Sequence, residues 1–247
     1  MADVLDLSVV VPVYDEAESL PVLWPELREV LEPLGLAFEV IFVDDGSRDA
    51  SAEIVRGFCA ADPRVRLLRF RANAGETAAT AAGFRAARGR QVVTMDGDLQ
   101  CDPHDIPGLL DHLRQWDAVT GWRVDRAAGD AWVRRASSRI ANRVRNALSE
   151  ESIQDSGCTF RAFRRECLQD LTLYTGFHRF IPTLLRMQGY RVLEAPVRHR
   201  PRRYGRSKYG IGNRALRAFV DLLVVRWMKR RRLRFEVAEA VGGEERR

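Results

Sequence analysis

The 247-residue sequence lacks the patterns typical of zinc sites, disulfide frameworks and membrane spans. Its four cysteines show no C-x-x-C spacing and its four histidines are scattered. Reduced cysteines favour a cytosolic compartment. Asp3 and Asp6 interrupt any early apolar stretch, which argues against a signal peptide. The late apolar run 222–225 is far short of the roughly 20 residues that a spanning helix needs, so we expect no membrane crossing by this chain.

A G-x-G-x-x-G fingerprint is also missing after the first apolar run, which argues against a dinucleotide-binding enzyme. Lysine is nearly absent, and basic residues are unevenly spread. Residues 198–235 hold fourteen Arg or Lys residues and a single acidic residue, Asp221, a net charge of +13. Because the whole chain carries +6, the rest carries −7. A segment with this much positive charge is expected to bind phosphate groups, which could belong to lipid head groups, a phosphorylated substrate or nucleic acid.

Apolar runs alternate with helical patterns through the first half of the chain. We expect strands at residues 7–13, 38–44, 65–70, 91–95 and 118–121, and helices at 19–34, 51–61, 76–87 and 106–115. This alternation predicts an α/β protein with a doubly wound parallel sheet.

The second half is less regular. It predicts helices at 132–148 and 177–188, strands at 158–163 and 190–197, a basic loop at 198–212 and an amphipathic helix at 211–231. We therefore divide the chain into a main α/β domain (1–197), a basic loop and amphipathic helix (198–235) and a polar tail (236–247). Phe219, Leu222 and Leu223 can contact a membrane surface, pack on the domain, or do both.

Two carboxylates, Asp96 and Asp98, directly follow the apolar run 92–95. In an open α/β sheet, ligands bind just beyond the carboxyl ends of the strands. Two aspartates at that edge can hold a hard divalent cation, and the cation can hold a diphosphate. A bare D-x-D is common on surfaces, but a second strand leads into Asp44 and Asp45 in the same way. The repetition favours a ligand site at this edge.

The first strand ends in an aromatic and acidic pentapeptide, residues 12–16 (Pro-Val-Tyr-Asp-Glu). The Tyr14 ring can stack on a nucleobase, and the Glu16 carboxylate can accept hydrogen bonds from base or ribose. Asp45, at the end of the second strand, is placed for the same ligand. The alternative is a plain strand-to-helix turn with acidic N-caps.

Several motifs in fixed order resemble those of glycosyltransferase family 2, whose members have the GT-A fold. They lie at residues 11–16, 43–49, 73–75 and 96–100, and later at 121–123, 155–161 and 202–209. The glutamine after the D-x-D, Gln100, resembles the polyprenyl-phosphate branch, the dolichol-phosphate mannose synthase and undecaprenyl-phosphate sugar transferase type. The resemblance runs from about residue 7 to residue 229.

The resemblance implies a set of site residues. A divalent metal, Mg²⁺ or Mn²⁺, would be held by Asp96, Asp98 and Gln100. The nucleotide sugar would be bound by Pro12, Tyr14, Glu16, Val43, Asp45, Asp96, Gly97, Gln100 and Arg202. Arg123, Arg202 and Lys208 would face phosphates. A metal and basic groups fit this chemistry, because negative charge develops on the nucleoside diphosphate as the sugar leaves.

Three further residues are candidates for catalysis. Lys208 is one of only two lysines against 38 arginines, which indicates a phosphate-binding point charge or a chance survival. Arg135, with Arg134 beside it, can hold the acceptor phosphate or lie on a solvated helix face. Asp155 is a general base in similar enzymes with hydroxyl acceptors. Because a phosphate acceptor is already ionised, we assign Asp155 first to positioning the sugar or a basic side chain.

We therefore expect an inverting enzyme that moves a sugar from a nucleotide sugar to a polyprenyl phosphate. It would act as a peripheral protein on the cytoplasmic face of the membrane, against an anionic surface and with a possible integral-membrane partner. The alternative is a related transferase with a hydroxyl acceptor. A nucleic-acid binder is disfavoured, because no recognition helix or aromatic RNA-binding motif is visible.

Overall fold

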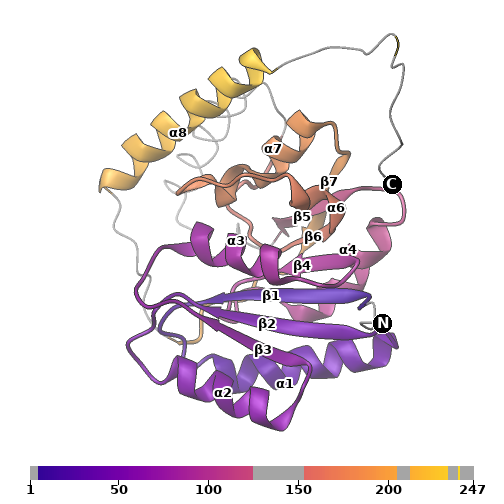
Figure 1. Cartoon of the computed structure of the whole chain (residues 1–247), viewed down its shortest axis with the longest axis vertical. Coiled ribbons are helices and arrows are strands. Elements are labelled where there is room, and N and C mark those ends of the chain that lie inside the picture. The colour runs from indigo at the N-terminus through magenta and orange to yellow at the C-terminus, as the bar shows by residue number, and fades with distance from the viewer. Residues whose placement is uncertain (1–4, 125–152, 205–211, 233–238, 240–247) are drawn as a thin grey trace.

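The computed structural model describes residues 5–124, 153–204, 212–232 and 239, and for 212–218 the backbone alone (Figure 1). Seven strands form one sheet: β1 (Leu7–Val13), β2 (Phe38–Asp44), β3 (Val65–Arg69), β4 (Gln91–Thr94), β5 (Ala118–Arg123), β6 (Arg161–Arg164) and β7 (Val192–Val197). Their order is β3-β2-β1-β4-β6-β5-β7. β6 runs antiparallel to β4 and β5, and the other pairs are parallel. The predicted α/β class is confirmed, with a mostly parallel sheet.

Helices cover both faces of the sheet (Figure 1). They are α1 (Leu20–Leu31), α2 (Ser51–Ala61), α3 (Glu76–Ala86), α4 (Ile106–His112), α6 (Glu166–Gln169), α7 (Ile181–Gln188) and α8 (Gly212–Arg231). Short 3₁₀ segments are η1 (Glu32–Leu34), η2 (Pro103–Asp105) and η4 (Phe177–Phe180). One hydrophobic core lies under α1, α2 and α4, and a second lies under α3, α6 and α7.

The central strands are apolar on both sides because both faces of the sheet are covered. In β1, Val9 and Val11 enter the first core while Val10 enters the second. Such strands read as continuous apolar runs, which is why β1 and β2 begin and end at the predicted residues.

Proline sets the largest difference from the predicted helices among the described residues. The expected helix 177–188 is split into η4 and α7, with Pro182 in the first turn of α7. Proline lacks a backbone N–H and is favoured in the first turn of a helix, where that N–H has no partner within the helix. The predicted helix 132–148 lies outside the described residues.

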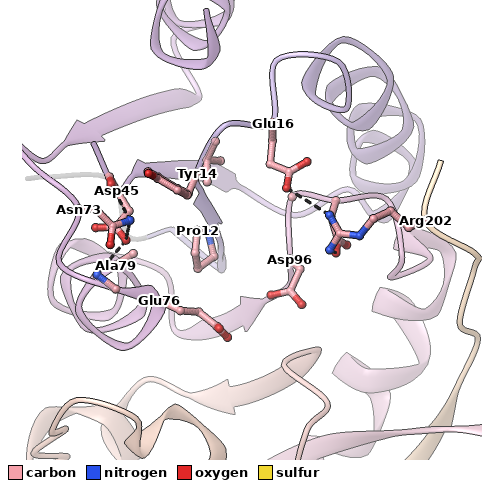
Figure 2. Close-up of a pocket in the computed structure, with 13 residues that line it drawn as sticks. Pro12, Tyr14, Glu16, Asp45, Asn73, Glu76, Ala79, Asp96 and Arg202 are labelled. Carbon is pink, nitrogen blue, oxygen red and sulfur yellow. Dashed lines mark hydrogen bonds and ion pairs between the residues drawn. The ribbon is translucent and has the colours of Figure 1, made fainter. Parts of the chain in front are cut away.

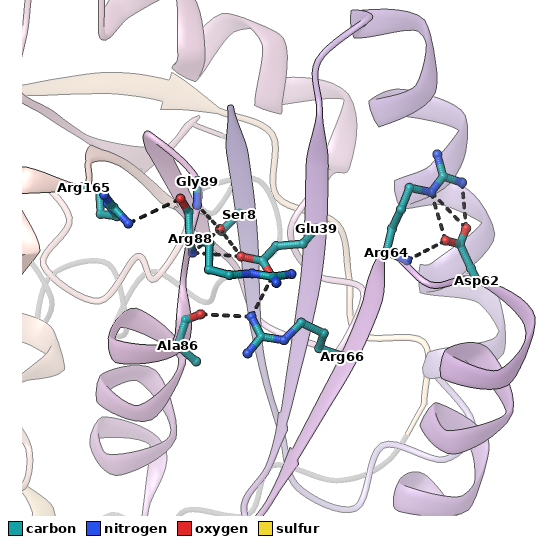
Figure 3. A network of polar contacts seen from close by, with 9 residues as sticks. All are labelled: Ser8, Glu39, Asp62, Arg64, Arg66, Ala86, Arg88, Gly89 and Arg165. Atoms are coloured by element: carbon teal, nitrogen blue, oxygen red, sulfur yellow. Dashed lines mark hydrogen bonds and ion pairs between the residues drawn. The ribbon is translucent and has the colours of Figure 1, made fainter. Parts of the chain in front are cut away.

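A buried polar network closes the amino-terminal edge of the strands (Figure 3). Glu39 of β2, only 1% exposed, accepts hydrogen bonds from Ser8 Oγ (2.8 Å), Arg66 Nη1 (2.6 Å) and Arg88 Nη2 (2.8 Å). Burial alone would raise the pKa of Glu39, but these hydrogen bonds lower it overall. The network joins β1, β2, β3 and the residues that follow α3.

Helix α8 is apolar on two sides. Leu222 and Val225 are buried against Phe177 and Phe180 of η4. A second row of side chains is exposed: Phe219, Val220, Leu223, Val224 and Trp227. In the described part of the chain, no helix is both long and apolar enough to span a bilayer.

Candidate active site

A pocket of about 300 Å³ opens at the carboxyl edge of β1, β2 and β4 (Figure 2). The strand order reverses here, because β2 lies on one side of β1 and β4 on the other. Ligands of open α/β sheets bind at such a reversal. The lining residues are Pro12, Val13, Tyr14, Glu16, Asp45, Asn73, Gly75, Glu76, Ala79, Asp96, Gly97, Asp98 and Arg202.

At one end of the pocket, Asp45 anchors the loop that precedes α3. Its carboxylate accepts hydrogen bonds from Asn73 Nδ2 (2.8 Å) and from the backbone N–H groups of Ala74 (2.7 Å) and Gly75 (2.9 Å). Burial raises the pKa of Asp45, and the two backbone N–H donors oppose that rise. The neighbouring Gly46 has φ +73°, and a Cβ there would lie 2.7 Å from the backbone of Asn73. The two loops therefore meet backbone to backbone.

The turn after β1 is tied to the turn after β2. Ser47 Oγ accepts a hydrogen bond from Asp15 N–H (2.9 Å), and Asp15 Oδ1 accepts one from Arg48 N–H (2.7 Å). Asp15 itself has φ 51°, a left-handed conformation that is uncommon outside glycine. These bonds hold the backbone that presents Tyr14 and Glu16 to the pocket.

At the other end of the pocket lie Asp96 and Asp98. Asp96 accepts a hydrogen bond from Thr159 Oγ1 (2.6 Å). Burial, and then the charge of Asp98, raise the pKa of Asp96 to about 6. Leu99 follows with φ 64°, and Gln100 N–H donates to Asp98 Oδ1 (3.0 Å). Negative charge is thus concentrated at this end, in a strained turn that the surrounding structure holds in place.

Among the described lining residues, Arg202 has the one basic side chain. It forms an ion pair with Asp98 and lies 3.6 Å from Glu16 (Figure 2). Its position follows from the chain after β7, where Arg200 N–H donates to the Gln100 carbonyl (2.9 Å) and Arg200 Nη2 donates to Asp102 (2.7 Å). Residues 200–202 are therefore held by hydrogen bonds and an ion pair along the turn at residues 98–102.

Asp96 and Asp98 suit a hard divalent cation. Burial, and then repulsion from Asp98, raise the pKa of Asp96, and a bound cation would relieve that repulsion. Arg202 already places a positive group on Asp98. Within the described ranges, no cluster of three or more His, Cys, Asp or Glu residues could enclose a metal. Mg²⁺ is commonly bound by one or two carboxylates together with substrate phosphates, which matches this pair.

Arg123, which is partly buried, and the buried Asp155 form an ion pair outside the pocket lining. Arg123 Nε and Nη2 donate to the two carboxylate oxygens of Asp155, at 2.6 and 2.8 Å. Burial would lower the pKa of Arg123, but the Asp155 hydrogen bonds raise it overall. The Asp155 carboxylate thus contacts a basic side chain on both of its oxygens.

The sequence matches the protein-family model for glycosyl transferase family 2 over residues 8–172. The chain belongs to this family. It is 36% identical, over 235 residues, to a dodecaprenyl-phosphate galacturonate synthase of Rhizobium johnstonii, with 93% of this chain and 69% of that protein covered. It is 38% identical, over 208 residues, to an undecaprenyl-phosphate 4-deoxy-4-formamido-L-arabinose transferase of Edwardsiella ictaluri, with 83% and 63% covered. The chain thus spans about two thirds of these relatives' length, and the expected resemblance to the polyprenyl-phosphate branch is confirmed.

Solved structures confirm the GT-A fold. A mannosyltransferase from Pyrobaculum calidifontis in complex with GDP-Man and Mn²⁺ superposes with a TM-score of 0.63 at 23% identity, covering 93% of this chain and 65% of that one. A glucosyl-3-phosphoglycerate synthase from Mycobacterium tuberculosis, in complex with Mn²⁺, UDP and phosphoglyceric acid, superposes with a TM-score of 0.66 at 20% identity, covering 92% and 78%.

The family 2 motifs converge on the pocket only in part. Eight of the expected site residues line it: Pro12, Tyr14, Glu16, Asp45, Asp96, Gly97, Asp98 and Arg202. Among the other expected residues, Val43 is fully buried in the sheet core. The Gln100 side chain lies 3.4 Å from His199 Nε2, away from the pocket lining. Arg134, Arg135 and Lys208 lie outside the described residues.

Five lining residues are not among the expected site residues: Val13, Asn73, Gly75, Glu76 and Ala79. Val13, Asn73 and Gly75 lie within the motifs that carry the family resemblance, whereas Glu76 and Ala79 lie outside them. The position of residues 73–79 could have indicated them, because this segment joins the end of β3 to α3 at the carboxyl edge of the sheet, where ligands bind. Position identifies the segment, but it does not show which of its side chains face the pocket.

Proposed function

We propose that this protein is an inverting glycosyltransferase that moves a sugar from a nucleotide sugar to a polyprenyl phosphate. The observation that carries the proposal is the pocket itself. It joins an aromatic and amide-lined end, with Tyr14 and Asp45, to an acidic end, with Asp96, Asp98 and Arg202. The relatives named for polyprenyl-phosphate sugar transfer support the choice of acceptor.

The two ends suit the two parts of a nucleotide. Tyr14 can stack on the base, and the loop that Asp45 holds in place forms a wall of the same end of the pocket. Asp96 and Asp98 would hold Mg²⁺ or Mn²⁺, which supplies positive charge for the leaving diphosphate. Arg202 adds a guanidinium at the same end, where it stabilises the charge that develops on the diphosphate.

The acceptor side is consistent with a phosphate nucleophile. A hydroxyl acceptor needs a general base, whereas a phosphate is ionised at neutral pH. Asp155 is engaged by two hydrogen bonds from Arg123 and so serves to position that side chain. Arg123 in turn is held near the acidic end, where its charge opposes the rise in the pKa of Asp96 that burial and Asp98 cause.

We propose further that the protein works at the cytoplasmic face of an anionic membrane, as a peripheral protein with a possible integral-membrane partner. The exposed apolar row on α8 lies beside Arg226, Lys229, Arg230 and Arg231. Each basic residue near an anionic leaflet contributes about 1 kcal/mol to binding.

Binding to anionic liposomes should weaken with added salt and with the substitution Trp227→Ser, while neutral liposomes serve as the control. Attachment that survives both changes would contradict peripheral binding.

The transfer itself is tested with a panel of UDP- and GDP-sugars, a short polyprenyl phosphate and Mg²⁺ or Mn²⁺. Mass spectrometry should detect a polyprenyl-phosphate sugar with one donor of the panel, and no product in excess chelator. Replacing the lipid phosphate by the matched polyprenol separates the two acceptor classes. Transfer to the polyprenol but not to its phosphate would reject the proposed acceptor.

A further inference from the structure

The first, third and fifth residues after β7 are arginines, and side chains two residues apart in an extended chain point to the same side. The first two of these arginines pair with acidic residues around η2 and α1. Arg198 forms ion pairs with Asp102 (3.2 Å) and Asp105 (2.8 Å), and Arg200 forms ion pairs with Asp102 (2.7 Å) and Glu26 (2.7 Å). These five side chains all lie outside the pocket lining, so their pairs serve to hold the segment in place.

The third arginine of the series, Arg202, differs because it and both of its acidic partners line the pocket (Figure 2). Its Nη2 donates to Asp98 Oδ2, and its Nη1 lies 3.6 Å from Glu16 Oε1. The side chain is 29% exposed, so a ligand that enters the pocket can reach it. Arg202 is therefore a group that the ligand itself would meet, whereas the other two arginines are not.

Both carboxylate oxygens of Asp98 have donors, and the two donors differ in how easily they can leave. Oδ1 accepts a hydrogen bond from Gln100 N–H (3.0 Å), which belongs to the backbone of the same turn. Oδ2 accepts its hydrogen bond from Arg202, whose long side chain can move without changing the backbone. A cation that binds Asp98 therefore meets the guanidinium at Oδ2, and the two positive groups repel each other at this short range.

We propose that Arg202 takes the place of a divalent cation on Asp98 until a nucleoside diphosphate enters, and that this exchange couples binding of the cation to binding of the nucleotide. The inference rests on the proposed function. Without the nucleotide, binding of the cation displaces the guanidinium and leaves two positive groups side by side. A diphosphate gives the displaced guanidinium new oxygen partners, which its planar fork binds well. The cation and the nucleotide therefore bind cooperatively, and Arg202 provides the coupling.

The test measures binding of Mn²⁺ to the full chain, with and without saturating UDP or GDP. The EPR signal of free Mn²⁺ gives the affinity, and the decisive quantity is the factor by which the nucleotide raises it. We expect a factor of about a hundred in the wild type. Titration calorimetry should find that Mn²⁺ raises the affinity for the nucleotide by the same factor, because coupling is reciprocal. The affinity of Mn²⁺ for the nucleotide in solution is common to all variants and cancels in their comparison.

Arg202→Met removes the guanidinium and keeps a long, uncharged side chain. Mn²⁺ alone should bind this variant about tenfold more tightly than the wild type, because no positive group has to be displaced. The factor by which the nucleotide raises the affinity for Mn²⁺ should fall at least tenfold. Weaker binding of Mn²⁺ alone would mean that Arg202 shapes Asp98 for the cation instead of occupying its place. That result, or unchanged binding, would overturn the inference.

Arg198→Met is the matched control, because it removes the same charge from the same segment. The partners of Arg198, Asp102 and Asp105, lie outside the pocket lining, so the affinity for Mn²⁺ should stay within about twofold of the wild type. An effect as large as that of Arg202→Met would mean that net charge alone sets the affinity, and the exchange would be wrong.

Failure of the exchange and failure of the proposed function give different results. If UDP or GDP binds cooperatively with Mn²⁺ and Arg202→Met leaves the cooperativity unchanged, only the exchange is rejected. If neither UDP nor GDP binds the wild type in the presence of Mn²⁺, the proposed function fails and the exchange fails with it.

Discussion

The two edges of the sheet treat a buried carboxylate in opposite ways. At the amino-terminal edge, burial acts to raise the pKa of Glu39, but Arg88, Arg66 and Ser8 lower it overall. At the carboxyl edge, burial and the charge of Asp98 raise the pKa of Asp96 to about 6. At the first edge, the arginines outweigh the cost of burying the charge. At the second edge, Arg202 pairs with Asp98 but the pKa of Asp96 stays raised, which suits a ligand that brings positive charge.

Asp98→Ala tests this contrast, and we expect it to have the largest effect on activity of the substitutions proposed here. Because Asp98 belongs to the edge that serves a ligand, kcat/KM should fall by about a thousandfold. Tm should stay within a few degrees of the wild type, since removing one of two repelling carboxylates relieves the other. A large loss of Tm with little loss of activity per folded molecule would reverse the assignment of the two edges.

Glu39→Gln is the mirror experiment. It removes a charge on which Arg66 and Arg88 depend, and we expect a loss of about 2 kcal/mol in the free energy of unfolding. Chemical denaturation measures this loss, and kcat/KM of the folded protein should not change. The loss should shrink in acid. The pKa of Glu39 is depressed in the folded state, so its contribution is present above its unfolded pKa and disappears as pH falls through the folded value.

Asp96→Asn should show the opposite pH dependence. The folded pKa of about 6 lies above the ordinary value of 3.8, so the protonated form is favoured by folding and the ionised form opposes it. At pH 7 without metal, Asp96→Asn should therefore stabilise the protein by about 1–2 kcal/mol, and the gain should vanish below about pH 4. Thermal melts of the variant and the wild type across this pH range measure the gain in stability.

The activity of the wild type should decline below about pH 6, because protons compete with the cation for Asp96.

Two hydroxyl groups give the smallest and most closely matched comparison. Ser8 Oγ donates to Glu39 and Thr159 Oγ1 donates to Asp96. Losing either bond should cost about 1 kcal/mol in the free energy of unfolding. Ser8→Ala should leave activity and Mn²⁺ binding unchanged, whereas Thr159→Val should also weaken Mn²⁺ binding, measured by calorimetry. Equal weakening of Mn²⁺ binding by the two substitutions would erase the distinction between the edges.

Local pattern was enough to predict much of the fold and part of the site. The strands β1 and β2 are apolar on both faces, and the acidic residues that end β2 and follow β4 stand out against them. The Glu39 network was not predictable, because a glutamate inside an apolar run shows nothing of the arginines that neutralise it. The contact between Glu76 and His178 joins residues 76 and 178, which only the tertiary fold brings together.

The meeting of the two loops at Gly46 also limits how this sequence can vary. Position 46 combines φ +73° with backbone atoms of residues 72 and 73 where a side chain would begin. Gly35 has a similar φ of +64° but open space around it, so asparagine can replace it at small cost. In a library of all substitutions, functional clones should therefore accept several residues at position 35 and glycine alone at position 46. The side chains at this end of the pocket could then vary among related sequences, but the close backbone contact at position 46 could not, because only glycine fits there.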